Sequence, residues 1–132
     1  LIIDEEENII GEEEKMLNTA LDISIDQLEE FVHSMNGIFI PAHVDKPKYS
    51  LISQLGFVPA DIKADALEIS KHISQETFYE KFNYLKKFML IQNSDAHYLD
   101  AIGEVSNDLN LSELTFIEIK KALKTNNSAL LA

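Results

Sequence analysis

Two short apolar runs, each followed within a few residues by a histidine, constrain the fold of this chain most strongly. The runs cover residues 38–40 and 88–91; His43 follows the first, and Ser-Asp-Ala-His at 94–97 follows the second. Apolar runs of this length, bounded by turn residues, are typical of buried strands. Helical patterns lie between them, so the sequence predicts an α/β fold. In such folds the carboxyl ends of parallel strands meet at one crevice, where functional residues gather.

The expected helices are marked by their caps. Ser24 and Gln27 form a capping box before an apolar stripe of Leu28, Phe31, Val32 and Met35, and Asn36-Gly37 supplies a left-handed stop. The other expected elements are a hairpin of residues 1–4 and 9–11, a short helix within 47–56 that ends at Gly56, a strand over 66–70, a helix capped by Ser74 and a helix from a Ser112 cap through Leu123. The tail after Thr125 is expected to fray.

The Asp-x-His pair at Asp95 and His97 has two interpretations. In extended backbone both side chains point to the same side, and with a third ligand they would hold zinc, manganese or iron, which acidifies a bound water. Alternatively, Asp95 caps a helix opening near Tyr98, and His97 is a surface residue. Capping is commoner than metal ligation, so the pair alone favours the cap. His43 lies at the end of another expected strand, and this second histidine at a strand end favours the metal-binding interpretation.

Three stretches together resemble a known family. Residues 40–47, 65–70 and 93–103 are similar, in order and interval, to the later motifs of the PHP (polymerase and histidinol phosphatase) metal-dependent phosphoesterases. The resemblance implies part of a distorted (β/α)7 TIM-like barrel, its C-terminal strands and helices only, with metal ions at the carboxyl ends of the strands. It also implies that the metal ligands are His43, Asp95 and His97.

Three further residues are candidates for supporting the ligands or contacting the substrate. Asp45 could steady its loop or His43. Lys46 could meet an anionic substrate, although exposed lysines are common. Glu68 lies within an apolar frame, so it is either hydrogen-bonded structurally or directed into the site. We favour the structural role for Glu68, because buried charges are normally paired and the resemblance does not make it a ligand.

The PHP enzymes open with a His-x-His motif, which this sequence lacks. We therefore expect a single domain over residues 1–132 that forms the second half of a longer protein. An open half-barrel would leave edges that pair with the missing N-terminal half or with another copy of the chain.

Composition limits the partners. The formal net charge is −12 and all 11 basic residues are lysines, so direct nucleic-acid binding is not expected. There is no apolar run long enough to cross a membrane and no leader pattern, so no membrane partner is expected. Without cysteine, disulfides and thiolate ligands are excluded. The expected compartment is the cytoplasm.

The sequence thus predicts metal-dependent hydrolysis of a phosphorylated small-molecule substrate, incomplete in this chain alone. The alternative is a regulatory or protein-interaction module that keeps the motifs without catalysis.

Overall fold

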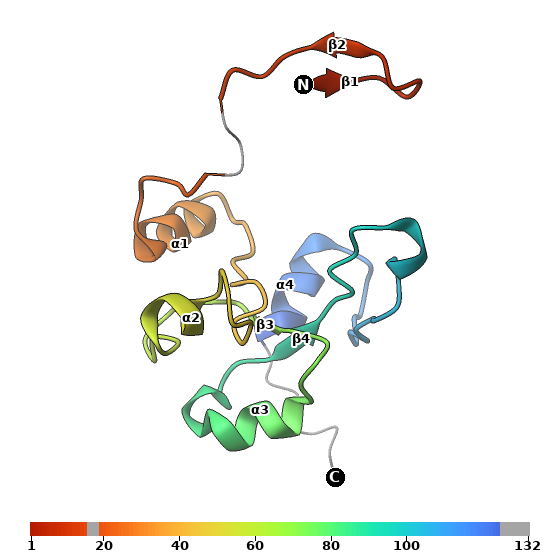
Figure 1. Ribbon diagram of the computed structural model, residues 1–132. Helices are drawn as coiled ribbons and strands as arrows, with labels where there is room; N and C mark the ends of the chain where they lie inside the picture. The colour runs from red at the N-terminus through yellow and green to blue at the C-terminus, as the bar shows by residue number, and fades with distance from the viewer. Residues whose placement is uncertain (16–18, 125–132) are drawn as a thin grey trace.

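The structure is a computed structural model that describes residues 1–15 and 19–124 (Figure 1). Its helices are α1 (Ile25–Ser34), α2 (Leu51–Leu55), α3 (Gln75–Lys81) and α4 (Phe116–Lys124), with short 3₁₀ turns η1 (Asn83–Leu85) and η2 (Leu99–Ala101). Its strands are β1 (Ile2–Ile3), β2 (Ile9–Gly11), β3 (Leu67–Ile69) and β4 (Leu90–Gln92).

The prediction that this chain forms part of a (β/α)7 TIM-like barrel is wrong. Within residues 1–15 and 19–124 the strands form two sheets of two strands each, an antiparallel β1–β2 pair and a parallel β3–β4 pair. A portion of a (β/α)7 barrel would join successive strands into one curved layer with a helix after each. The architecture is instead a small α/β arrangement in which α3 connects the two parallel strands.

The apolar run at 38–40 is not a regular strand, although it lies beside β3. The Phe39 carbonyl accepts a hydrogen bond from the Asp65 amide at 2.9 Å, and the Val44 amide donates to the Glu68 carbonyl at 2.8 Å. Pro41 has no amide hydrogen to donate, so a continuous ladder cannot form there. The 39–44 segment, β3 and β4 therefore run side by side with β3 in the middle.

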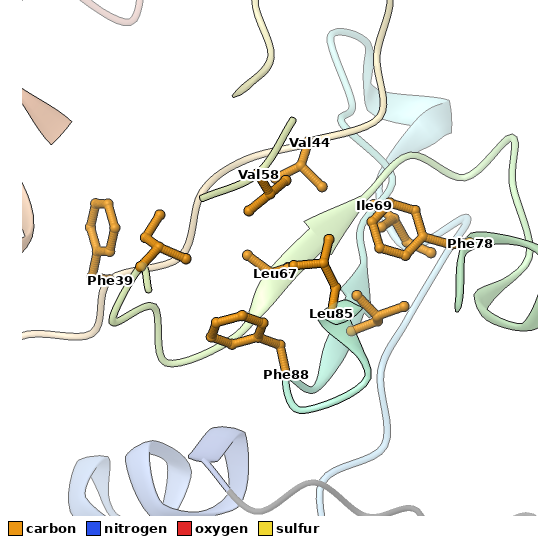
Figure 2. Packing of buried hydrophobic residues seen from close by; sticks show 10 residues of the cluster. Phe39, Val44, Val58, Leu67, Ile69, Phe78, Leu85 and Phe88 are labelled. Atoms are coloured by element: carbon orange, nitrogen blue, oxygen red, sulfur yellow. The ribbon is translucent and has the colours of Figure 1, made fainter. Parts of the chain in front are cut away.

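The hydrophobic core surrounds β3 (Figure 2). Leu67 and Ile69 are fully buried, and Phe78 of α3 packs with them. The remaining buried members of the cluster are Phe39, Val44, Val58, Ile62, Leu85, Phe88 and Leu90. Val44, Val58, Phe78 and Leu85 are as fully buried as Leu67 and Ile69, so β3 lies at the centre of a closely packed core.

The start and the end of α1 are confirmed. The Ser24 hydroxyl accepts from the Gln27 amide, and the Gln27 side chain accepts from the Ser24 amide at 2.9 Å. At the other end Asn36 has a φ of 58°, and the Gly37 amide donates to the Val32 carbonyl at 2.9 Å. These are the bonds of a Schellman motif, which satisfies the last carbonyls of the helix.

The expected apolar stripe of α1 is only partly buried. Leu28 and Val32 pack against the core. Phe31 and Met35 are more than half exposed. The spacing identified one helical face correctly, but only the part of that face next to the core is covered.

The last helix begins later than expected. The prediction that Ser112 caps the last helix is wrong. The helix α4 starts at Phe116, and the hydroxyl of the preceding Thr115 accepts a hydrogen bond from the Glu118 amide at 3.3 Å. The Ser112 hydroxyl instead donates to the Glu118 carboxylate. The expected caps of the shorter helices are confirmed, with Ser74 capping α3 and a left-handed Gly56 ending α2.

The N-terminal hairpin is confirmed and lies apart from the core in Figure 1. The tail after Thr125 lies outside the described residues. In the described part of the chain the helices have at most ten residues, and none has the length and apolar character that crossing a bilayer requires.

Candidate functional site: a pocket at the carboxyl ends of the parallel segments

A pocket of about 200 Å³ lies where the 39–44 segment, β3 and β4 end. Its wall contains both signs of charge. The ionisable side chains that line it are His43, Lys46, Glu68, Lys71, His72 and Asp95. A water molecule takes roughly 30 Å³ of liquid volume, so the pocket has room for a phosphate-sized group. The parallel arrangement brings together residues that lie up to 52 positions apart in the sequence.

His43 stands at a sharp turn. Its φ is 29°, a region that side-chain-bearing residues rarely adopt, and its amide donates to the Glu68 carboxylate at 3.1 Å. The ring Nδ1 of His43 is buried and has no hydrogen-bond partner. A buried polar atom without a partner is costly, and a bound water, ion or ligand would satisfy it.

Glu68 links all three segments of the layer. One carboxylate oxygen accepts from the His43 amide, and the other accepts from the Asn93 side-chain amide at 2.9 Å. Both hydrogen bonds support the structural role that the sequence favoured. The same side chain also lines the pocket, so Glu68 holds the loops of two neighbours while facing the site.

Asp95 lines the pocket and is paired there with a lysine. Its φ is 49°, so the expected extended backbone is wrong at this residue. Its carboxylate forms an ion pair with Lys46. The hydrogen bond from Lys46 is the largest cause and lowers the pKa of the Asp95 carboxyl below its usual value. Burial acts in the opposite direction, and the charges of Lys46, His97 and His43 lower the pKa further.

The interpretation of Asp95 as a helix cap is also wrong. The turn η2 that follows has no side-chain hydrogen bond at its N-terminus. His97 is exposed, and its Nδ1 donates to the Asp95 carbonyl at 2.9 Å. His97 does not line the pocket, but its charge is near enough to influence Asp95.

Asp45 supports the pocket wall and not His43. Its carboxylate accepts from the amide of Ser70 at 2.6 Å and from the Ser70 hydroxyl at 2.5 Å. The backbone of Lys46 is fixed in the same loop, since its amide donates to the His43 carbonyl at 3.0 Å and its carbonyl accepts from Ser50 at 2.6 Å.

Six other residues line the pocket and were not identified from sequence as candidate site residues: Ile69, Ser70, Lys71, His72, Asn93 and Ser94. The available signal was position, because each lies at the end of β3 or β4 or within three residues after it. Lys71 is paired with Glu104 at 2.6 Å, so its ammonium is not free in this structure.

The donor chemistry of the pocket fits a divalent metal ion in part. The buried Nδ1 of His43 and the Asp95 carboxylate are nitrogen and oxygen donors that suit zinc, manganese or iron. A complete set is not assembled: in residues 1–15 and 19–124, no three His, Asp or Glu side chains are grouped so that they could hold an ion.

Comparison with known proteins gives one relative and no family. No family model matches the chain, and no solved structure matches it. The chain is 34% identical over 110 residues to a Bacillus subtilis (strain 168) protein described as uncharacterized protein YqxK. The match covers 74% of this chain and 26% of that protein, so the chain spans about a quarter of the length of the curated relative it matches.

Proposed function

We propose that this chain provides part of the metal-binding pocket of a metal-dependent phosphoesterase, which hydrolyses a phosphorylated small molecule. The observation that carries the proposal is the convergence of His43, with its buried unpartnered Nδ1, and Asp95 on one pocket that also contains lysines. The resemblance of the flanking motifs to the PHP phosphoesterases supports the same reaction class.

His43, Asp95 and His97 are the proposed ligands. A divalent ion bound by them would supply Lewis-acid chemistry, lowering the pKa of a bound water and stabilising charge on a phosphoryl oxygen. Glu68 would keep the His43 loop in position through its hydrogen bond to the His43 amide. Lys46 would provide positive charge for the anionic substrate.

Further ligands would come from outside these residues. The proposed sources are an N-terminal half of a longer protein and a second copy of the chain. The net charge of −12 favours a small substrate over nucleic acid. A cytoplasmic location is part of the proposal and is supported by the absence of cysteine.

A regulatory or protein-interaction module is the second candidate function. It is favoured by the ion pair between Lys46 and Asp95, which already satisfies the carboxylate proposed as a ligand. In such a module the pocket would be a structural remnant.

Metal content separates the two functions. We expect the full-length protein to purify with zinc, manganese or iron, measured by mass spectrometry, and a His43→Ala, His97→Ala double variant to lose it. His72→Ala is the matched control, because His72 lines the same pocket but is not a proposed ligand. Metal-dependent hydrolysis of p-nitrophenyl phosphate should follow the metal content. Equal metal in all three proteins, or none in any, would contradict the proposed ligands.

A further inference from the structure

The N-terminal hairpin carries its apolar side chains on its outside. Between 46% and 77% of the surface is exposed for each of Leu1, Ile2, Ile3, Ile9 and Ile10. The turn is nevertheless well ordered, because the Asp4 carboxylate accepts from the Glu6 and Asn8 amides at 3.1 and 2.8 Å. A hairpin of two strands is marginally stable by itself in water, and a cluster of exposed isoleucines is typical of a surface that packs on another molecule.

The hairpin is also strongly acidic, and this charge limits what it can pack on. Seven of the 23 acidic residues lie within residues 1–15, which contain one lysine. Two hairpins placed against each other would therefore repel. The surface that fits this hairpin is apolar and has a positively charged border.

The chain itself carries such a surface, the lysine-bordered patch, which consists of the exposed Leu55, Phe57, Tyr84, Lys81, Lys86 and Lys87. The two segments that form it lie side by side. The Tyr84 hydroxyl accepts from the Val58 amide at 3.3 Å and donates to the Val58 carbonyl at 3.1 Å. Lys87 donates to the Ala60 carbonyl.

The border of the patch is positive in a chain whose net charge is −12. The sequence has no acidic residue from 81 to 94, and the three lysines outnumber the adjoining Asp61 and Glu80. Lys81 and Lys87 lie over the rings of Phe82 and Phe88, 5.4 and 4.8 Å from the ring centroids. An aromatic ring and a carbonyl are uncharged, so these contacts leave the ammonium charge in place.

The position of the hairpin favours a patch on another molecule. In Figure 1 the hairpin lies at one end of the chain, and α2 and α3, which precede the two segments of the patch, lie toward the other. The hairpin of one copy is therefore placed to reach the patch of a second copy.

We propose that the hairpin of one copy docks on the lysine-bordered patch of a second copy, and that the reciprocal contact closes the pair into a symmetric dimer. The contact area is small, so the dimer is weak and the chain is a monomer at low micromolar concentration. Neither surface contains a residue that lines the pocket, so this inference is independent of the proposed function.

The first test is sedimentation velocity of the 132-residue chain between about 10 µM and about 1 mM, the range of weak association. We expect the monomer to convert to a dimer as the concentration rises. An Ile9→Thr, Ile10→Thr variant keeps β-branched residues in β2 and should dimerise roughly tenfold more weakly, because apolar contact is lost. A chain that stays monomeric throughout would overturn the inference.

The second test uses two charge-reversed variants, Glu12→Lys, Glu14→Lys in the hairpin and Lys81→Glu, Lys86→Glu in the patch. Each alone should dimerise roughly tenfold more weakly, because both reciprocal contacts lose attraction between exposed charges. Lys48→Glu, which reverses an exposed lysine outside the patch, should change little. Circular dichroism confirms that each variant is folded.

Mixing the two charge-reversed variants gives the sharpest result. In a mixed dimer one of the two contacts is formed by an unmodified hairpin and an unmodified patch, whereas neither variant alone has such a contact. The mixture should therefore associate roughly threefold more tightly than either variant. Association that both variants retain, or a mixture no tighter than its components, would overturn the inference.

Discussion

Asp65 is the most deeply placed acidic side chain described in this chain. Its carboxylate is fully buried and accepts hydrogen bonds from His33 Nε2 at 2.9 Å and from the Phe39 amide at 2.8 Å. Lys124 of α4 lies 3.1 Å from its other oxygen, and the second nitrogen of His33 meets Glu29 at 3.3 Å. The network joins α1, the residues before β3 and α4, and His33 is a partly exposed residue within it.

Loss of the Asp65 charge should destabilise the fold. Asp65→Asn leaves His33 and Lys124 without their carboxylate, and losing hydrogen bonds to a charged group costs about 1.5–3 kcal/mol. Asp61→Asn is the control, because Asp61 is exposed and four residues away. Urea denaturation of the two variants measures the difference. Equal midpoints would mean that the network contributes nothing.

The same residue should make stability depend on pH. Burial by itself raises the pKa of Asp65, but the bonds from Phe39, His33 and Lys124 together lower it below its ordinary value of 3.8. A lowered pKa gives stability that is present above pH 3.8 and is lost as the pH falls through the pKa of the folded state. The gap in unfolding free energy between the unmodified protein and Asp65→Asn should therefore narrow below about pH 4. A gap that stays constant from pH 6 to pH 2.5 would contradict this assignment.

At the scale of elements, the junction after α1 has no room for a side chain. A Cβ on Gly37 would lie 2.7 Å from Val32 Cγ1 and 2.9 Å from the Val32 carbonyl oxygen. Lys120 of α4 donates to the carbonyls of Asn36 and Gly37 at 3.1 and 2.7 Å, so the same turn also holds α4.

Gly37→Ala should therefore lower the free energy of unfolding by about 1–3 kcal/mol, the usual cost of overpacking. Asn36→Gly is the control in the same turn, since glycine readily adopts the positive φ found there, and it should be close to neutral. Thermal denaturation followed by circular dichroism compares them. A larger loss for Asn36→Gly than for Gly37→Ala would show that the turn is not limited by space.

The sequence predicted well those elements that are marked by residues close to one another along the chain. The capping box of Ser24, the Ser74 cap, Gly56 and the hairpin depend on residues within a few positions of each other, so their patterns are visible in sequence. The 38–40 run failed as a strand because Pro41 interrupts its pairing with a partner 25 or so residues away. The Ser112 cap of α4 failed because Ser112 and Thr115 are both acceptable N-cap residues, and the sequence pattern did not distinguish between them.

In the candidate site too, some features could be predicted from the sequence and others depend on the fold. His43, Lys46, Glu68 and Asp95 were identified from sequence, and the structure places all four at one pocket. The partner of Asp45 could not be predicted, because its bonds to Ser70 depend on which segments become neighbours. That Asp95 and His97 bind metal stays a prediction.

At the scale of the whole molecule, the N-terminal hairpin should be separable from the core. The core cluster draws on residues from Ile25 onward, and Figure 1 shows the hairpin at a distance from β3. Removing residues 1–15 should thus leave the urea midpoint of the core unchanged within error. A clearly lower midpoint would show that the hairpin contributes to the stability of the core.

The barrel expectation failed at this same scale. Motifs at 40–47, 65–70 and 93–103 led to the candidate site residues, but they do not fix how many strands join one sheet. That number depends on contacts across the whole chain, which periodicity in single segments does not report.

The central place of β3 has a consequence for how the protein folds. Val44 pairs with Glu68 across 24 residues, and Leu67 pairs with Leu90 across 23. The entropy of closing a loop depends on the logarithm of its length, so the two closures cost nearly the same. The entropy of loop closure therefore favours neither pairing. The 39–44 segment and β4 can pair with β3 in either order. Both routes require β3, because the 39–44 segment and β4 each pair with this strand and not with one another.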